Sequence, residues 1–512
     1  MSAQPDVIVV GGGTAGAIIT RRLLDAGKTV HLLEAGVTDD NIDIQDMSRL
    51  GLLWFSKDDW GYHTTPQKHA NGRKLHWPRG KVLGGSHSLN ASIYVRGNQK
   101  DYDDWEAAGC TGWGWKNVEK IFTEKIENWQ GEPNGLGTKG LLDVTTDYPK
   151  NPVQTSIIEA GVQWGMKRNP NYNSADMEGI AQEQLNMRDG QRFSTYRAYL
   201  HPVRDHKNLT ITTGAWVHRL IFEGNRVVGV EYEKGGATHE LHGGEVALCG
   251  GALDTPRILL LSGVGPKKEL EALDIDVKVD LPGVGKNLHD HLLVPIIFTT
   301  SKKSVEMPPP ANVPITQVHW FWKSRPDLDR PDTQPLAFSV PMVTDTTDLS
   351  KVPESGFTIM GGLVTPKSRG EFTLASKDPH VETLQNPNIL EHPDDVATLV
   401  ASVKQVREVA KQAALADEWG AEESELSRHL VTDEEIAEYS RNNAITYHHQ
   451  VGTAKMGTDA MSVVSPTSLK VIGLEGVRVC DASVMPKVTN GNTNAPSMII
   501  GEKAADFIIA GA

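Results

Sequence analysis

The sequence predicts an α/β fold that begins with a Rossmann-type domain, and three observations support this prediction. Residues 6–10 are an apolar, β-branched run of the kind that forms a buried parallel strand. A glycine-rich turn, a helical segment over residues 17–24 and a second strand over residues 29–33 follow, and together they make a βαβ unit. The chain has 512 residues but no sharp domain boundary, which indicates two domains woven from alternating segments.

The rest of the chain carries weaker signals. Residues 37–150 are rich in Trp, Gly and charge, and predict irregular structure. Residues 208–249 predict short strands with turns at residues 224–225 and 235–236. Residues 397–415 and 433–442 predict helices, and the last fifteen residues predict an amphipathic helix.

Composition and charge disfavour several classes of protein. The chain has 51 Lys and Arg against 65 Asp and Glu, a formal net charge of −14, so it would repel nucleic acid and anionic membranes. It has no apolar run of about 18 residues, which predicts no membrane span. The start lacks the pattern of a signal peptide, and the three cysteines lack CxxC spacing. We therefore expect a cytoplasmic protein without a metal centre.

The glycine-rich turn has the spacing of a dinucleotide site. Gly11, Gly13 and Gly16 form GxGxxG, which allows a tight turn, close approach of a pyrophosphate and close helix packing. The start of the helix offers free N–H groups to the phosphates. Glu34 ends the second strand, where a carboxylate can accept hydrogen bonds from ribose hydroxyls. The motif does not separate FAD from NAD, but its N-terminal place before a long irregular segment favours FAD.

Four later segments resemble signatures of the glucose–methanol–choline (GMC) oxidoreductases. Residues 80–90 (GKVLGGSHSLN) resemble the first signature, and residues 251–265 (GALDTPRILLLSGVG) resemble the second. Residues 282–291 (PGVGKNLHDH) resemble a further family segment, and residues 481–486 (DASVMP) with 492–494 (NTN) resemble the C-terminal block. These segments follow the family order over the whole chain. They are most similar to bacterial choline-oxidase-like and hydroxymethylfurfural-oxidase-like alcohol oxidases and dehydrogenases.

The resemblance implies a FAD-binding domain interwoven with an α+β substrate domain that has a large antiparallel β-sheet and helices. We expect the FAD-binding domain in residues 1–150, 205–295 and 460–512, and the substrate domain in residues 151–204 and 296–459. The glycine motif and the resemblance together predict these cofactor contacts: Gly11, Gly13, Thr14, Ala15, Gly16, Glu34, Ala35, Gly84, Gly85, Asn90, Ala91, Val217, Asp481, Ala482, Asn492 and Thr493.

The resemblance also bears on how FAD is attached. Some relatives carry FAD on a histidine immediately before the residue that matches Asn90, and this chain has Leu89 there. We therefore expect non-covalent FAD. A covalent link through His87, two positions away, is the alternative, and a hydrogen-bonded loop histidine is the simpler interpretation of that residue.

A Tyr-His-His-Gln-Val-Gly-Thr stretch contains the predicted proton acceptor. The family's catalytic histidine stands three residues before the glycine of the Gly-Thr pair, which selects His449, and its second partner matches Asn492. A neutral imidazole with a pKa of about 6.5 can take an alcohol proton, whereas Asn492 can only donate to the substrate oxygen. Tyr447 and His448 are candidate pocket residues, with structural packing as the other interpretation of His448. Asn494 is the alternative register for Asn492.

These residues predict FAD-dependent oxidation of a primary alcohol to the aldehyde, or on to the acid, with O₂ as acceptor and H₂O₂ as product. A dehydrogenase that uses a quinone or another acceptor is the alternative, followed by a hydroxynitrile lyase or a non-catalytic flavoprotein. Choline is disfavoured, because residues 318–322 lack the carboxylate that choline oxidases place there. Trp320 is either a substrate wall or a core residue. An aromatic or medium-chain alcohol is favoured, with sugars as the alternative.

Overall fold

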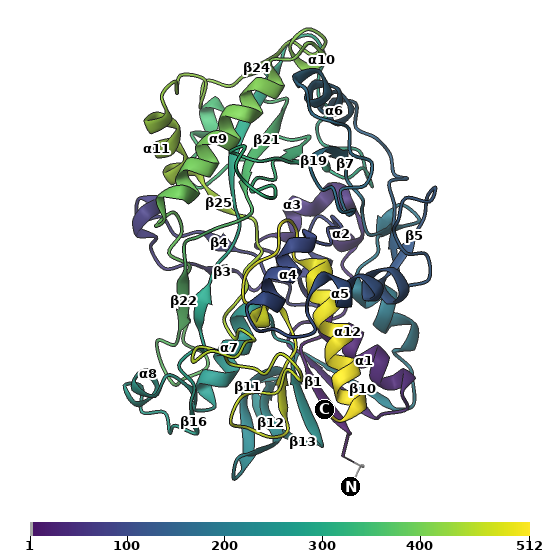
Figure 1. The fold of residues 1–512 in the computed structure, drawn as a ribbon, viewed down its shortest axis with the longest axis vertical. Helices are drawn as coiled ribbons and strands as arrows, with labels where there is room; N and C mark the ends of the chain where they lie inside the picture. Colours follow the sequence, from purple (N-terminus) through teal and green to yellow (C-terminus); the bar gives the residue numbers. More distant parts are fainter. Residues whose placement is uncertain (1–3) are drawn as a thin grey trace.

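A five-stranded parallel sheet forms the centre of the lower half of the molecule in Figure 1. The structure, a computed structural model, describes residues 4–512. The strands lie in the order β10–β2–β1–β14–β26, and each neighbouring pair is parallel. Their bounds are Val7–Val10 (β1), Val30–Glu34 (β2), Leu209–Thr213 (β10), Glu245–Leu248 (β14) and Val477–Val479 (β26). The predicted N-terminal βαβ unit is therefore present.

Two helices from opposite ends of the chain pack together beside this sheet (Figure 1). They are α1 (Thr14–Asp25) and α12 (Asn494–Ala510). The successive residues Met498, Ile499 and Ile500 of α12 are all fully buried. Successive helical residues point in different directions, so α12 is a buried helix and not the amphipathic surface helix that the sequence predicts.

Two smaller elements complete this half of the molecule. A three-stranded antiparallel sheet contains β11 (Trp216–Glu223), β12 (Arg226–Lys234) and β13 (Ala237–His242). Helix α7 (Gly251–Leu261) follows β14 and packs against β11. The predicted short strands over residues 208–249 are therefore present, and two of them, β10 and β14, belong to the parallel sheet.

A larger antiparallel sheet forms the upper half of the molecule (Figure 1). Its strands lie in the order β24–β18–β21–β20–β19–β7, with β25 paired to β18. The bounds are Gly179–Gln182 (β7), Leu292–Thr300 (β18), Thr316–Phe321 (β19), Leu336–Phe338 (β20), Gly356–Leu363 (β21), Ala421–Glu423 (β24) and Ile445–Thr446 (β25). Helices α6 (Pro152–Trp164) and α9 (Pro393–Ala410) pack on it, and α11 (Asp433–Asn443) packs on α9. The predicted fold class is confirmed.

Strand alternation gives the antiparallel sheet two apolar faces. Successive strand residues point to opposite faces. Leu292, Ala337 and Ile359 belong to the core beneath the helices, whereas their neighbours Leu293 and Met360 belong to a separate core on the other face. That second face is the one that turns toward the parallel sheet and forms part of a pocket.

The two halves draw on alternating chain segments, as expected. All five strands of the parallel sheet fall inside the segments predicted for the nucleotide-binding domain. The border predicted at residue 295 falls inside β18, and β22 (Gly370–Thr373), predicted in the substrate domain, pairs with β17 (Lys286–Leu288). The domain limits stay a prediction.

The region over residues 37–150 is more regular than the sequence predicts. It contains helices α4 (Gln99–Ala107) and α5 (Trp115–Ile121) among its loops. Asn98 and Asp101 close a capping box at the start of α4, which explains why that helix begins there. Within residues 4–512, no helix is both long enough and apolar enough to cross a membrane.

Gly16 in α1 tests the packing of the glycine motif. A Cβ atom at Gly16 would overlap the carbonyl oxygen of Gly11. We expect Gly16→Ala to lower the free energy of unfolding by about 1–3 kcal/mol, as overpacking does, and to release bound flavin. Gly51→Ala is the matched control, since Gly51 is a helical glycine with open space around it. Chemical denaturation of both variants would measure the effect, and equal stabilities would contradict this account.

Candidate active site

A pocket lies between the carboxyl ends of β1 and β2 and the inner face of the antiparallel sheet. Seventeen of the residues predicted from the sequence line it: Gly11, Gly13, Thr14, Ala15, Glu34, Ala35, Gly85, Asn90, Ala91, Val217, Tyr447, His448, His449, Asp481, Ala482, Asn492 and Thr493. Gly16 and Gly84 do not line the pocket themselves, but each is adjacent in the chain to a residue that does. The structure therefore brings together residues that are up to 482 positions apart.

One end of the pocket has the features of a dinucleotide cradle. Gly13 is the N-cap of α1 and supplies no side-chain cap, so the first N–H groups of the helix stay available to a phosphate. Glu34 accepts hydrogen bonds from the N–H groups of Gly12 (2.7 Å) and Gly36 (2.8 Å). Burial raises the pKa of Glu34 to about 7. A Cβ atom at Gly85 would lie only 2.8 Å from the Cα of Gly13. The two glycine turns can therefore approach this closely only because residue 85 has no side chain.

Two tryptophans that no sequence pattern marks, together with Arg257 from the segment over residues 251–265, form the far end of this cradle. The rings of Trp60 and Trp216 lie 5.8 Å apart, and the Arg257 guanidinium lies 4.8 Å from the centre of the Trp216 ring. Arg257 also donates to the carbonyl of Val217 (2.7 Å) and to Asp254 (2.9 Å). These two indole rings line the same wall as Val217, the residue expected to contact adenine through its backbone. Aromatic faces of this kind suit a nucleotide base.

His87 is held by hydrogen bonds to its neighbours. Its Nδ1 accepts from the N–H of Thr195 (3.1 Å), and the side-chain amide of Asn494 lies 3.1 Å from the same atom. Asn494 also accepts from the Thr14 hydroxyl (2.7 Å) and so connects His87 to the start of α1. Burial lowers the pKa of His87 to about 3, so the ring is neutral.

His449 lies at the other end of the pocket, against the predicted partner. Its Nε2 is 3.4 Å from the side-chain nitrogen of Asn492, and its Nδ1 is 3.0 Å from Nδ1 of His291. Burial, with smaller contributions from His291, His448 and the Arg79 charge, holds the pKa of His449 well below its usual range. The ring is therefore neutral at neutral pH, the state in which an imidazole can accept a proton.

The hydrogen bonds around His449 indicate which of its two ring nitrogens carries no proton. Gln334 donates to the amide oxygen of Asn492 (3.1 Å), which turns the Asn492 nitrogen toward His449. That nitrogen is a donor, so Nε2 of His449 must be the acceptor and carries no proton. The proton of the neutral ring is then on Nδ1, where it is donated to His291. The arrangement leaves an unprotonated Nε2 on the pocket side.

Asp290 and His291 both contact His449, and both belong to the segment over residues 282–291. Asp290 accepts from the backbone N–H of His449 (2.7 Å) and from the side chain of Gln450 (2.8 Å). Burial lowers the pKa of His291 to about 3, so its ring is also neutral. The family-like pattern of the segment was the available signal for these two residues, but it assigned them no role. No sequence pattern marks Gln334.

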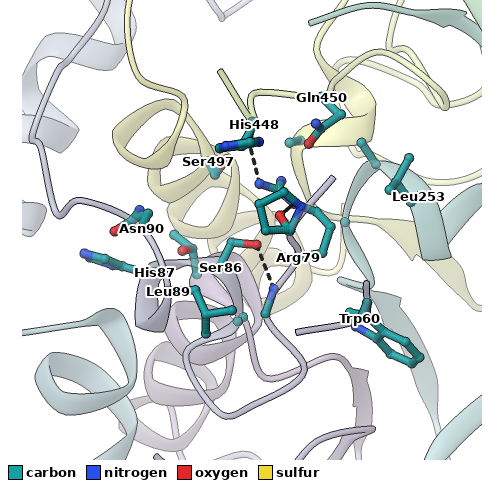
Figure 2. A pocket seen from close by; sticks show the side chains of 18 of the residues that line it. Trp60, Arg79, Ser86, His87, Leu89, Asn90, Leu253, His448, Gln450 and Ser497 are labelled. Atoms are coloured by element: carbon teal, nitrogen blue, oxygen red, sulfur yellow. Dashed lines mark hydrogen bonds between the residues drawn. The ribbon is translucent and has the colours of Figure 1, made fainter. Parts of the chain in front are cut away.

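His448 points away from His449. It has a left-handed backbone, with φ of 66°, and its ring contacts the hydroxyl of Thr446 (2.7 Å) and the edge of Trp54. Figure 2 shows Arg79 beneath it, with a hydrogen bond to the His448 carbonyl (2.6 Å). Tyr447 stacks on the His449 ring at 4.8 Å. Tyr447 and His448 therefore line the pocket on either side of the loop.

Trp320 does not belong to this pocket. It lies on β19 in the core beneath the helices, fully buried, and donates to the side chain of Gln405 on α9 (2.9 Å). Its neighbour Phe321 belongs to the core on the opposite face. Strand alternation thus directs Trp320 away from the pocket, and the core interpretation replaces the substrate-wall interpretation.

A dinucleotide cradle that opens onto a neutral histidine and an amide defines a dinucleotide-dependent oxidoreductase. The chain belongs to the GMC oxidoreductase family, whose N- and C-terminal models match residues 5–293 and 366–501. It is 38% identical to "Alcohol dehydrogenase [acceptor]" of Pseudomonas putida, over 98% of this chain and 95% of that protein. It is 36% identical to "Oxygen-dependent choline dehydrogenase" of Staphylococcus saprophyticus, over 99% and 95%. The crystal structure of pyridoxine 4-oxidase from Mesorbium loti superposes with a TM-score of 0.92 at 30% identity, over 98% and 99%.

The family assignment makes the protein a FAD-dependent oxidoreductase that acts on CH–OH groups. The residues present fit FAD. The open α1 N-terminus and the contact of Gly13 with Gly85 suit a pyrophosphate, Glu34 would be available to a ribose, and Trp216 would offer an aromatic face to the base. The long pocket continues from there to His449. The predicted family and cofactor type are thus confirmed.

His291 tests the hydrogen-bond logic of the site. We expect His291→Leu to lower the rate of flavin reduction by about 10- to 100-fold, the usual effect of losing a positioning partner, because Nδ1 of His449 loses its acceptor. His291→Gln offers an amide oxygen in its place and should recover part of the rate. Stopped-flow reduction with bound flavin matched between variants is the measurement. Equal rates for His291→Leu and wild type would rule out this positioning role.

Proposed function

We propose that the protein oxidises an apolar primary alcohol to its aldehyde, with His449 as proton acceptor. The observation that carries this proposal is the unprotonated Nε2 of His449, held 3.4 Å from the Asn492 amide at the pocket surface. FAD bound in the pocket would supply the acceptor for the hydride at its N5 position. The neutral, hydrogen-bonded His87 supports non-covalent attachment of FAD.

The proton step uses two groups of the chain. The alcohol carbon becomes a good hydride donor only as its O–H proton leaves, so Nε2 of His449 takes that proton. The Asn492 amide donates to the same oxygen while negative charge develops on it. General-base assistance of this kind contributes roughly 10² to 10⁴ in rate. Gln334 keeps Asn492 in the donating orientation.

The wall around His449 supports an apolar substrate. The residues of the antiparallel sheet that reach the pocket are all apolar: Leu293, Leu336, Phe338, Met360 and Ile445. The acidic residues of the described lining, Glu34, Asp254 and Asp481, lie on the nucleotide-binding half. Asp290 is turned away, with its oxygens on the His449 backbone and Gln450. A quaternary ammonium group would find no carboxylate on this wall, which favours an aromatic or medium-chain alcohol over choline.

The electron acceptor separates two versions of the proposal. We favour O₂, with H₂O₂ as product, and the similarity to an oxygen-dependent choline dehydrogenase and to pyridoxine 4-oxidase supports this choice. The name of the Pseudomonas putida relative, an alcohol dehydrogenase that uses an acceptor, supports a dehydrogenase as the second candidate. Anaerobic reduction by an alcohol panel followed by air distinguishes them: rapid recolouring with peroxide means oxidase, and persistent bleaching means dehydrogenase.

His449→Ala tests the proton acceptor. We expect the variant to keep its flavin spectrum but to reduce flavin at least about 10²-fold more slowly with the best alcohol of the panel. Anaerobic stopped-flow absorbance is the measurement. His242→Ala serves as the control and should react like wild type, because His242 is a partly exposed histidine on β13, outside the pocket. A near-normal rate for His449→Ala would remove His449 from this role, and a flavin that no alcohol bleaches would favour the lyase alternative.

The low pKa of His449 predicts the pH profile. The base works only when unprotonated, and burial holds its pKa well below the usual value. Activity is therefore present above this lowered pKa and is lost as the pH falls through it. We expect kcat/KM to be flat between about pH 6 and pH 9 and to fall only at lower pH. A half-maximal rate near pH 7 that disappears in His449→Ala would contradict the burial argument.

A further inference from the structure

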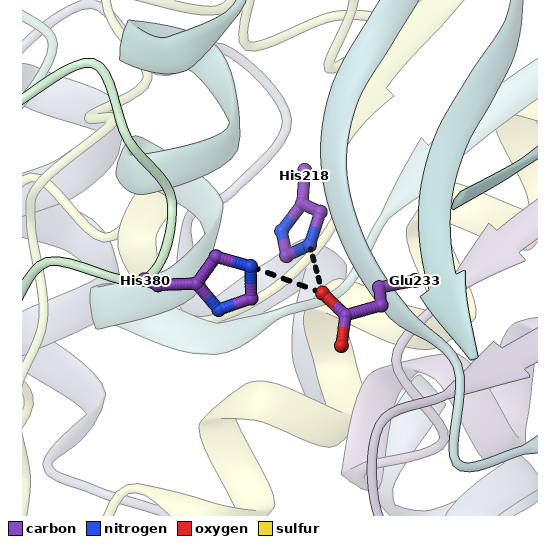
Figure 3. A group of neighbouring side chains, drawn as sticks. All are labelled: His218, Glu233 and His380. Atoms are coloured by element: carbon purple, nitrogen blue, oxygen red, sulfur yellow. Dashed lines mark hydrogen bonds and ion pairs between the residues drawn. The ribbon is translucent and has the colours of Figure 1, made fainter. Parts of the chain in front are cut away.

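A second cluster of side chains lies behind Trp216, away from His449. Figure 3 shows His218, Glu233 and His380 pointing toward one another. Nε2 of His218 is 3.5 Å from a Glu233 oxygen, and Nε2 of His380 is 3.1 Å from the same oxygen. One ligand atom from each residue lies within 4.8 Å of the other two. This cluster takes no part in the alcohol chemistry.

Three separate segments build the cluster, and each is held in place. The pairing of β11 with β12 is interrupted between Val217 and Arg219, and such a bulge re-aims the side chain at the extra residue, His218. Glu233 is on β12, and its ladder partner is Trp216. His380 belongs to the loop between β22 and β23 (Leu384–Asn386). Arg219 donates to the carbonyl of Lys377 (2.9 Å) and so fixes this loop to β11.

The spacing fits a four-coordinate metal ion. Ligands at about 2.0–2.2 Å from Zn²⁺ in tetrahedral directions are separated by about 3.3–3.6 Å. The Nε2 atoms of His218 and His380 lie 3.5 Å and 3.1 Å from the Glu233 oxygen, close to this ligand–ligand separation. The centre of the Trp216 ring lies 4.7 Å from the centre of the His218 ring and 5.5 Å from that of the His380 ring, both in T-shaped contacts that restrict the imidazoles.

The chemistry of the three residues suits a divalent transition metal. Imidazole and carboxylate are preferred ligands of Zn²⁺. Burial, followed by the charge of Arg257, lowers the pKa of His218, so its ring is neutral and can bind a metal. His218 is buried, whereas the side chain of His380 is 56% exposed, so an ion can enter from solvent and keep a water as fourth ligand.

We propose that His218, Glu233 and His380 form a binding site for one Zn²⁺ ion. The ion would join the loop over residues 374–383 to the strand that carries Trp216 and Val217, the wall of the nucleotide end of the pocket. The sequence predicts no metal centre, because its cysteine pattern lacks zinc spacing and because His380 lies 147 positions after Glu233. Only the fold brings them together.

Zinc titration of the flavin-loaded protein, first stripped of metal with a chelator, tests this site. We expect calorimetry to show one saturable Zn²⁺ per chain, and His380→Ala to weaken binding at least about 100-fold, since loss of even an outer partner costs 10- to 100-fold. Glu233→Gln preserves the size of the side chain but removes the negative charge of the ligand, so it should also weaken binding. His242→Ala is the matched control: His242 forms a similar exposed pair with Glu240 (3.3 Å) without a second histidine, and it should bind Zn²⁺ like wild type.

Two further readouts separate metal binding from a folding defect. Without Zn²⁺, the flavin content and the Tm of His380→Ala should equal those of wild type, because the side chain is largely exposed. Zn²⁺ should raise the Tm of wild type and of His242→Ala, but not that of His380→Ala. The proposal is overturned if no saturable site appears, if His380→Ala and Glu233→Gln bind like wild type, or if His242→Ala weakens binding as much as they do.

Discussion

The pairing of β18 with β25 is the constraint on which the active site depends. In this antiparallel ladder Leu292 pairs with Thr446 and Leu293 with Ile445. The same pairing continues outward, since the N–H of Tyr447 donates to the carbonyl of His291 (2.9 Å). Register in an antiparallel pair fixes which side chains face each other. The ladder ends one residue before His291 and three residues before His449, so both histidines lie just beyond its end, where their rings meet.

Asp290 adds the second restraint at this point. A carboxylate aimed at the backbone N–H of His449 fixes the loop, whereas a carboxylate on the ring would raise its basicity. Removing it would leave a buried N–H unpaired, at a cost of about 1–3 kcal/mol. The imidazole of His449 meets a neutral histidine instead. Asp290 thus positions the backbone of His449, whereas His291 and Asn492 determine the tautomer of its ring.

Sequence patterns predict the parts of this protein that are local. The βαβ unit, Glu34 at the end of β2, and the histidine before Gly-Thr each depend on residues close together in the chain. Gln334 meets Asn492 across 158 positions, and the loop that carries His380 meets β11 across more than a hundred, contacts that one sequence does not reveal. Trp320 shows a third case. Alternation was evident along residues 318–322, but only the packed helices decide which face is the pocket.

Four histidines can lie close together at this pocket because none of them is charged. Burial lowers the pKa of His87, His291 and His448 to about 3 and that of His449 well below its usual value, so all four are neutral. The nearby cation of Arg79 lowers the pKa of His448 and His449 further. A base with so low a pKa gives its proton back to solvent readily at neutral pH. As the proposed proton acceptor, His449 would therefore lose its proton again before each new alcohol arrives, and the same burial that makes it a weak base would regenerate it.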